Sequence, residues 1–133
     1  MALTEGTRVI KAGIPADGIL MPCAEAVKRG DLLGIDSDGA VFPVDSDDGE
    51  HGRLIAGADG ATSEYIPCYW MAVIDGFTSG TEAAAIYPSA TPGSYTETAD
   101  TDAGDSNEIV GYVMTETMIM VLPGVRADSV VAT

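Results

Sequence analysis

Short apolar runs separated by glycine, proline and acidic residues are the dominant pattern of this chain. None of the runs keeps a helical period for long, and turn-forming residues interrupt the chain at fairly regular intervals. Brief strands joined by tight turns produce this pattern, whereas an amphipathic helix repeats its apolar positions with a helical period. The pattern therefore predicts an all-β domain with at most one short helix. The apolar runs are TRVIK, DLLGI, AVFPV, RLIAG, YWMAVI, AAIYP, EIVGYVM and TMIMVL.

Residues 23–30 are the best helix candidate. The last turn would contain Lys28 and Arg29, followed by a C-capping glycine, although the segment allows only about two turns. We expect a turn or a single short helix there. Proline removes a backbone donor from a strand, so Pro43 and Pro67 each predict an edge strand or a bulge.

Turn chemistry predicts two hairpins. Asp38 tolerates left-handed backbone angles and Gly39 adopts them freely, so the DSDG stretch predicts a tight turn between two strands. Two further strands are expected to meet at residues 115–117. The second of these, in TMIMVL, lacks polar alternation, which predicts burial on both faces or cover by a partner subunit. Residues 87–104 are rich in turn-forming residues and predict a surface loop around at most one weak strand.

Length and charge limit the function. A chain of 133 residues is sized for one compact domain. Its 21 acidic and 6 basic residues give a net charge of −15, and that field repels phosphate backbones and anionic lipid. We therefore expect neither nucleic acid nor a membrane as a partner. Because the acidic residues are spread along the chain, we hypothesise a protein that works in high salt, where the Debye length is only about 3 Å at 1 M.

The chain start and the cysteines bear on the compartment. MALTEGTRVIKAG contains no basic segment followed by an apolar one, so we expect no secretory signal. We expect the protein to be made in a cytoplasm. No apolar stretch approaches the length of a membrane helix. Cys23 and Cys68 fit no zinc pattern. Buried free thiols are the favoured interpretation, with one disulfide as the alternative.

Three acidic clusters that contain glycine raise the question of a cation site. An EF-hand loop needs ligands at its first, third and fifth positions, glycine at the sixth and glutamate at the twelfth. Counted from Asp36, Asp45 or Asp100, glycine comes too early, so no cluster fits that motif. A weak site of another kind is an alternative, because clustered carboxylates repel one another and attract a cation. Its residues would be Asp45, Asp47, Asp48 and Glu50.

The sequence contains no complete catalytic motif. His51, the single histidine, lies in a glycine-flanked loop, and a pair with Cys68 would still need an orienting group and an oxyanion hole. The zinc deaminase pattern fails because Glu50 precedes the histidine and Met71 replaces the second cysteine. Phosphate loops and the G-x-S-x-G elbow are missing. We therefore expect no enzyme activity, no cofactor and no bound metal, with His51 as a solvated loop residue.

Aromatic and sulfur-containing side chains gather in two stretches of the sequence. The first contains Tyr69, Trp70, Met71 and Phe77, and the second contains Met114, Met118 and Met120. Core filling is the favoured role for most of them, although surfaces rich in methionine and aromatic residues also serve as adaptable interfaces. A subunit interface is predicted at Tyr69, Trp70, Met71, Met118 and Met120.

Three stretches together resemble one known family. They are AEAVKRGDLLGIDSDGAVFPV, YWMAVIDGFTSGTEAAAIYPSATPGSYTETA and IVGYVMTETMIMVLPG, and they cover most of residues 19–124. A glycine precedes a short apolar strand, an Ala-Ile-Tyr-Pro strand follows a glycine turn, and a glycine-bearing strand precedes a closing apolar one. This pattern resembles the head decoration, or cement, proteins of tailed double-stranded DNA viruses. It contains no catalytic motif.

The resemblance implies a small β-barrel or β-tulip-like domain over residues 19–124, an extended N-terminal arm over 1–18 and a C-terminal tail over 125–133. Such a protein lies on the outer capsid surface of the virion as a homotrimer, and it clamps neighbouring subunits of its partner, the major capsid protein. The arm would add a strand to the capsid through its backbone. Its binding residues would be Thr7, Arg8, Val9, Ile10 and Lys11. The net charge of −15 adds the hypothesis of a halophilic, archaeal host.

A binding module is the alternative from a different functional class. A monomeric β-rich domain could bind carbohydrate or a host surface through Trp70 and the loop at residues 87–104. Oligomeric state separates the two hypotheses. The cement protein predicts a symmetric oligomer or assembly that depends on the capsid, whereas the module predicts a monomer that binds glycans.

Overall fold

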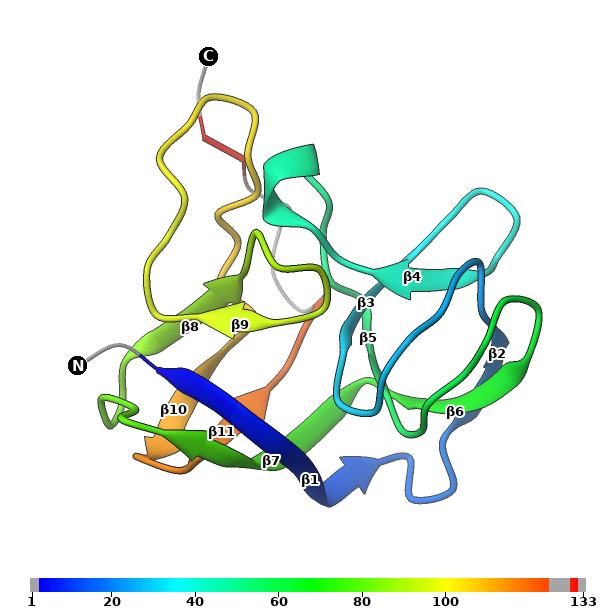
Figure 1. Ribbon diagram of the computed structural model, residues 1–133, viewed down its shortest axis with the longest axis horizontal. Coiled ribbons are helices and arrows are strands. Elements are labelled where there is room, and N and C mark those ends of the chain that lie inside the picture. The colour runs from blue at the N-terminus through cyan, green and yellow to red at the C-terminus, as the bar shows by residue number, and fades with distance from the viewer. Residues whose placement is uncertain (1–2, 125–129, 132–133) are drawn as a thin grey trace.

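The chain folds into two antiparallel β-sheets that curl around shared apolar side chains. The computed structural model describes residues 3–124, 130 and 131, and Figure 1 shows the two sheets side by side. The prediction of an all-β, barrel-like domain is confirmed. Within the described residues the only helical element is one 3₁₀ turn, η1 (Ser46–Asp48). Residues 23–30, the candidate for a short helix, instead form turns and isolated bridges.

Six strands form the first sheet and five form the second. The first has the order β1-β7-β11-β10-β8-β9 and the second the order β2-β6-β5-β3-β4. The first sheet consists of β1 (Thr4–Ile14), β7 (Met71–Thr78), β11 (Met118–Val121), β10 (Gly111–Thr115), β8 (Ala85–Pro88) and β9 (Tyr95–Thr96). The second consists of β2 (Ile19–Pro22), β6 (Tyr65–Tyr69), β5 (Leu54–Ala56), β3 (Leu32–Ile35) and β4 (Val41–Pro43). No helix in the described part of the chain is long and apolar enough to cross a membrane.

The sheets are joined where two neighbouring chain segments pass from one sheet to the other. Strand β6 ends at Tyr69, and β7 begins at Met71 in the other sheet. Beside them, the chain passes from β1 to β2, and Ile14 pairs with Met71 while Ile19 pairs with Cys68. At this joint the amide of Trp70 donates a 2.9 Å hydrogen bond to the carbonyl of Ile14. The joint therefore links the two sheets through both the chain and a backbone hydrogen bond.

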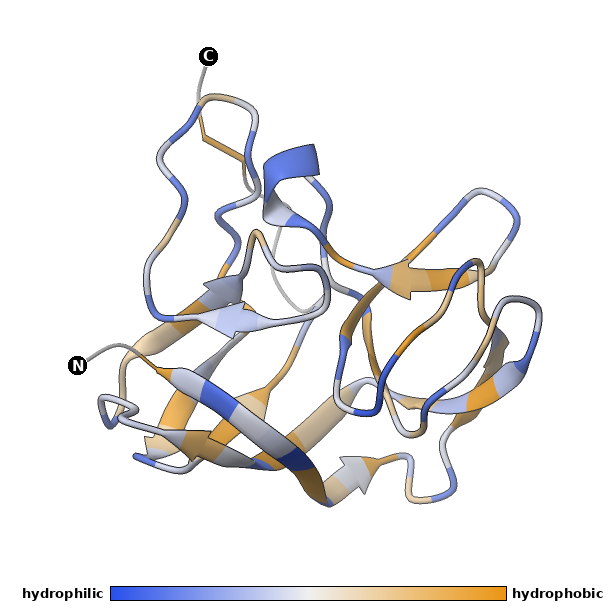
Figure 2. Ribbon diagram, in the orientation of Figure 1, coloured by the Kyte–Doolittle hydropathy of each residue, from blue (hydrophilic) through white to orange (hydrophobic). Residues whose placement is uncertain are grey.

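The core has two parts, one on each face of the five-stranded sheet. The larger part lies between the sheets, where Leu32 and Ile55 meet Ile74 and Ile119. Strand β3 is buried on both faces, because the next residue, Leu33, belongs to the second part. Figure 2 shows that the strands carry most of the hydrophobic residues and that the connecting loops are largely hydrophilic. The second part is formed by Cys23, Val27, Leu33, Val41, Leu54, Ala56, Ile66 and Cys68.

Both predicted hairpins are confirmed. Strands β3 and β4 pair across the DSDG turn, where Gly39 has a φ of 79°. The Asp36 carboxylate closes that turn by accepting hydrogen bonds from the amides of Asp38 and Ala40 at 2.9 and 3.0 Å. Strands β10 and β11 form the second hairpin. The acidic side chain of Asp36 thus builds the first turn, as local chemistry predicts, whereas the Thr115 hydroxyl accepts hydrogen bonds from the amides of Thr117 and Met118 in the second.

The two strand prolines behave differently. Pro43 lies in β4, which is an edge strand as predicted. The prediction for Pro67 is wrong, because β6 lies between β2 and β5 without a register shift. Strand β5 pairs with β6 only through Tyr69 and Cys68, so Pro67 lies beyond the ladder on that side. Its carbonyl accepts a 2.8 Å hydrogen bond from Gly57, and the site uses no donor from Pro67.

Of the two alternatives predicted for the closing strand, burial on both faces within the domain is wrong, and cover by a partner subunit stays a prediction. Along β11, Ile119 and Val121 are buried in the core, whereas Met118 and Met120 are half-buried on the other face. The strand therefore alternates, and methionine occupies the outward positions. Methionine is an apolar residue like its neighbours, so the pattern of apolar and polar residues did not show this alternation.

The predicted N-terminal arm contains strand β1, the edge strand of the six-stranded sheet. It pairs antiparallel with β7, with Val9 opposite Asp75 and Ile10 opposite Ile74. Residues 4–14 are thus part of the domain's own sheet. Of the predicted C-terminal tail, residues 125–129, 132 and 133 lie outside the described residues, and 130 and 131 lie beside the loop that precedes β10.

Arg8 is the one side chain of β1 that is buried. Its guanidinium hydrogen-bonds to the buried Asp31 carboxylate and lies 2.5 Å from a Glu5 carboxylate oxygen. It also donates to the carbonyls of Arg29 and Gly93 at 3.1 and 3.2 Å. Asp31 in turn accepts a 2.9 Å hydrogen bond from the amide of Lys28. The pair thus joins β1 to the segment that enters β3 and to the loop before β9.

We predict that Asp31→Asn destabilises the protein by about 3–5 kcal/mol, because it leaves the buried Arg8 guanidinium without its main counter-charge. Urea unfolding followed by circular dichroism gives the free energy of unfolding. The control is Lys11→Gln, which breaks the exposed 3.9 Å contact with Asp75 and should cost less than about 1 kcal/mol. A similar small cost for both variants would contradict an anchoring role for the buried pair.

Candidate functional site

The predicted interface residues separate into two groups in the structure. Met71, Met118 and Met120 lie on the outward face of the six-stranded sheet, on the side opposite to the buried Ala72 and Ile119. Tyr69 and Trp70 do not lie on this face. Tyr69 packs against the larger core, with its ring against Gly13 and Gly57, and Trp70 is 48% exposed at the joint between the sheets.

Two residues that the sequence analysis missed complete this outward face. Met120 pairs with Val73 on one side and with Tyr112 on the other, and residues paired across strands share a face. Val73 is half-buried and Tyr112 is 43% exposed. We call the set Met71, Val73, Met118, Met120 and Tyr112 the methionine face. Alternation with the buried Ala72, Ile74 and Val113 is the sequence signal that could have identified it.

The methionine face carries almost no net charge. Asp75, which pairs with Met118, is the acidic residue on this side of β7, and the Lys11 ammonium lies 3.9 Å from its carboxylate. Val9 and Ala12 of β1 extend the apolar rows beyond β7, since they pair with Asp75 and Val73. On a chain with a net charge of −15, this neutral apolar area differs from the surface around it.

The predicted arm residues occupy different environments along β1. Arg8 is buried, Ile10 is half-buried, and Thr7, Val9 and Lys11 are exposed. Arg8 is not available to an external anion, because it is buried against Asp31, whereas the ammonium of Lys11 is exposed and lies 3.9 Å from the Asp75 carboxylate. What β1 does offer is its outer edge, which pairs with no other strand in the described part of the chain. Backbone donors and acceptors on such an edge can pair with an added strand.

His51 is not the solvated loop residue that we expected. Its side chain is half-buried, with Nδ1 3.3 Å from the Ser106 hydroxyl and 3.8 Å from the buried Glu108 carboxylate. Both groups approach the same ring nitrogen, whereas a Ser-His-carboxylate triad uses the two nitrogens separately. Cys68 is in the smaller core part, so the structure does not build the His51–Cys68 pair either. His51 packs the 45–52 loop against the segment before β10.

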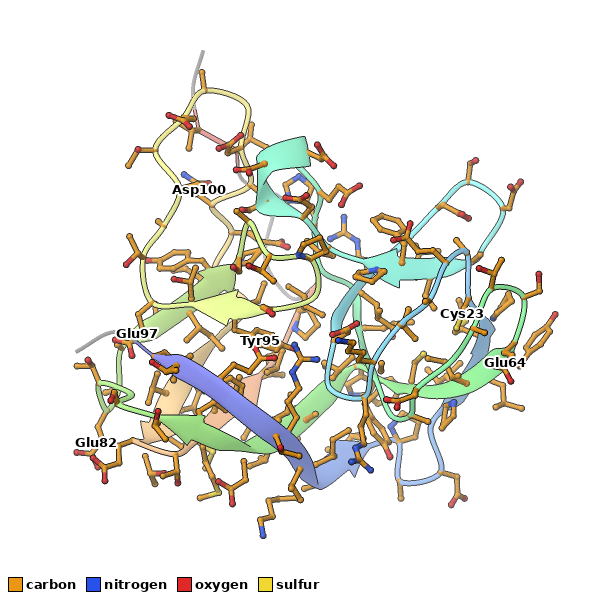
Figure 3. All side chains as sticks on the ribbon, in the orientation of Figure 1. Cys23, Glu64, Glu82, Tyr95, Glu97 and Asp100 are labelled. Carbon is orange, nitrogen blue, oxygen red and sulfur yellow. The ribbon has the colours of Figure 1, made fainter. Side chains whose placement is uncertain are left out.

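The two cysteines are free thiols, as the favoured interpretation predicted, and both are buried. Burial raises the pKa of the Cys68 thiol from 9.0 to about 12, and the nearby Cys23 adds to the effect. Burial also raises the pKa of Cys23, with a further contribution from Glu64, which lies close to it in Figure 3. Thiols held in this way react slowly, because the thiolate is the nucleophile.

Acidic side chains from two distant segments meet beside η1. One oxygen each of Asp47, Asp100 and Asp105 lies within 4.8 Å of the others. Of the alternative set Asp45, Asp47, Asp48 and Glu50, only Asp47 belongs to this group. Asp45 caps η1 by accepting from the amide of Asp47 at 2.9 Å, and Glu50 accepts from the amide of Asp45 at 2.8 Å.

No protein-family model, curated protein or solved structure shows a significant match to this chain.

We predict that alkaline pH destabilises the fold through Cys68. Because its pKa is raised in the folded state, the unfolded chain releases the thiol proton first, and stability falls as the pH rises from 9.0 towards about 12. Urea midpoints measured across this range should fall less steeply for Cys68→Ala than for the wild type. The variant's cavity lowers its stability at every pH, so only the slope is diagnostic. Equal slopes would refute the prediction.

Proposed function

We propose that this chain is a structural virion protein. It binds the outer surface of a capsid and stabilises the lattice by cementing neighbouring major capsid protein subunits, and it does so as a homotrimer. The methionine face is the observation that carries the proposal. The resemblance of residues 19–124 to head decoration proteins supports a viral capsid as the lattice to which the chain binds.

The methionine face supports self-association on energetic grounds. Contact between two copies of a −15 chain brings like charges together, which opposes association. The cost is smallest where the surface is apolar and its few charges are paired, as Lys11 and Asp75 are. Methionine side chains are flexible and polarisable, so they fit an irregular partner surface well. A contact between copies is therefore most favourable at this face.

A closed threefold ring needs two different surfaces on each copy, because each subunit presents one patch to one neighbour and another patch to the other. Leu20 is 66% exposed on β2, and Tyr65, on the same face of the adjacent β6, is exposed as well. This second apolar patch is available to receive the methionine face of the next subunit. The outer edge of β1 then stays free for a strand of the capsid protein.

The monomeric binding module keeps one specific observation in its favour. Trp70 is exposed at the joint between the sheets, and aromatic rings stack well on sugar faces. The loop at residues 87–104 supports this alternative less, because Tyr95 is buried and donates a 2.8 Å hydrogen bond to the Gly30 carbonyl. A glycan screen in which Trp70→Ala abolishes binding by a monomer would favour the module over the cement protein.

We predict that Met120→Lys abolishes trimer formation and uptake onto undecorated capsid shells without unfolding the domain, because a charge in an apolar contact is costly to desolvate. Light scattering with size exclusion at molar salt measures both properties. Ile35→Lys is the matched control, since it adds the same charge at an exposed position of β3. A wild-type monomer that ignores the shells would refute the proposal.

We also predict that stability rises with salt. Raising the salt from 0.1 to 1 M shortens the Debye length from about 10 to about 3 Å and so weakens the repulsion among the acidic side chains. The urea midpoint in KCl should increase over this range. Full stability in dilute buffer, with no further gain in salt, would argue against a halophilic origin.

A further inference from the structure

A hollow of about 330 Å³ lies between the first half of β1 and two loops of the five-stranded sheet. Residues 5–8 line its β1 side, and Lys28, Arg29 and Asp59 line the other side. The lining includes no residue of β7, the strand that pairs with β1, so the hollow borders the edge of β1 that carries no strand in the described part of the chain. We call this hollow the β1 groove. Backbone groups on such an edge can pair with an added extended segment.

Half of the cations of the chain line the β1 groove. The sequence contains six lysine and arginine residues, and Arg8, Lys28 and Arg29 are three of them. The charge of Arg8 is compensated by Asp31 and Glu5. Lys28 and Arg29 are exposed, and within the described residues neither side chain forms an ion pair with a carboxylate. On a chain with 21 acidic residues, these two positive charges remain available to an external carboxylate.

The main chain fixes the position of both cations beside the groove. The amide of Arg29 donates a 2.8 Å hydrogen bond to the Asp59 carboxylate, and its carbonyl accepts a 3.1 Å hydrogen bond from the Arg8 guanidinium. The amide of Lys28 donates a 2.9 Å hydrogen bond to the buried Asp31 carboxylate. Asp59 thus satisfies a backbone amide, and both cationic side chains start from a held backbone. Because this backbone is already ordered, a ligand loses less entropy by binding here.

We propose that the β1 groove binds an extended segment of a protein partner that carries acidic side chains. The backbone of the segment pairs with the free edge of β1, and its carboxylates contact Lys28 and Arg29. The charges select this occupant, because most of the surface repels an acidic segment and these two cations attract it. A basic segment would instead be held by carboxylates elsewhere on the surface. At about 0.15 M salt the Debye length is about 8 Å, so the two adjacent cations outweigh the distant carboxylates.

The proposal deepens the proposed function and rests on it only for the identity of the partner. If the chain cements a capsid, the acidic segment belongs to the major capsid protein. The chemistry of the groove itself does not depend on that identity, so it can be tested without a capsid.

A peptide probe provides this test. The probe alternates glutamate and valine over about eight residues, a usual strand length, so its carboxylates all lie on one face of the extended chain. It carries a fluorescent label, and its polarisation is measured with the full chain in the lowest KCl concentration that keeps the domain folded by circular dichroism. We expect saturable binding that weakens as KCl is raised. The same peptide with glutamine in place of glutamate should bind about tenfold more weakly, as expected for the loss of two contacts between exposed charges.

Matched variants locate the binding on the protein. The double variant Lys28→Gln, Arg29→Gln should bind the glutamate peptide about tenfold more weakly than the wild type does. Lys11→Gln removes a cation that lies outside the β1 groove and should leave the affinity unchanged. Lys11 and Lys28 are the two lysines of the chain, so carbodiimide coupling gives a second readout. It should join the carboxylates of the peptide to Lys28 in preference to Lys11.

Equal binding of the two peptides, or an equal loss of affinity in Lys11→Gln and the double variant, would overturn the proposal. Coupling of Lys28 mainly to carboxylates of another copy of the chain would overturn it as well. Uptake onto capsid shells separates the groove from the proposed function. A wild type that binds the peptide but not the shells would refute the function alone, and one that binds the shells but not the peptide would refute the groove alone.

Discussion

The buried ion pair between Arg8 and Asp31 is the interaction on which much of this structure depends. It joins the edge strand β1 to the segment that enters β3, and two glycines leave space for it. Gly30 and Gly93 both have positive φ values, and a side chain at either position would collide with Arg8 or Asp31. Because β1 is anchored here, its pairing with β7 is fixed, and so is the extension of the methionine face by Val9 and Ala12.

The strong acidity of the chain is compatible with folding because the carboxylates take on local tasks. Asp36 closes the β3–β4 turn, Asp45 caps η1, and Asp31 neutralises a buried arginine. These groups stabilise structure while the surface stays strongly negative. In the proposed trimer this acidity would direct association, since most of the surface would repel another copy and the neutral methionine face would not. The excess of acidic residues thus affects both the stability of the domain and the surface at which the proposed association would occur.

The sequence predicted the elements that depend on local chemistry. The hairpin turn at Asp38 and Gly39 follows from backbone preferences that do not depend on tertiary contacts. The sequence did not predict which face Met120 occupies, because its apolar neighbours masked the alternation of β11. It also did not predict that Asp47 meets Asp100 and Asp105, because that contact depends on how the two sheets pack. Pro67 was misplaced for the same reason, since its tolerance depends on where the neighbouring strand β5 ends.

Besides the shared apolar core, connections of different kinds join the two sheets. The passage from β6 to β7 is covalent, the Arg8–Asp31 contact is an ion pair, and the contact between Ser46 and Ser106 is a backbone hydrogen bond beside a cluster of repelling carboxylates. The hydrogen bond between Ser46 and Ser106 is opposed by the repulsion among the neighbouring carboxylates. For a protein proposed to clamp neighbouring subunits, rigidity between its own sheets is a functional property, because a flexible clamp transmits little of the force that it opposes.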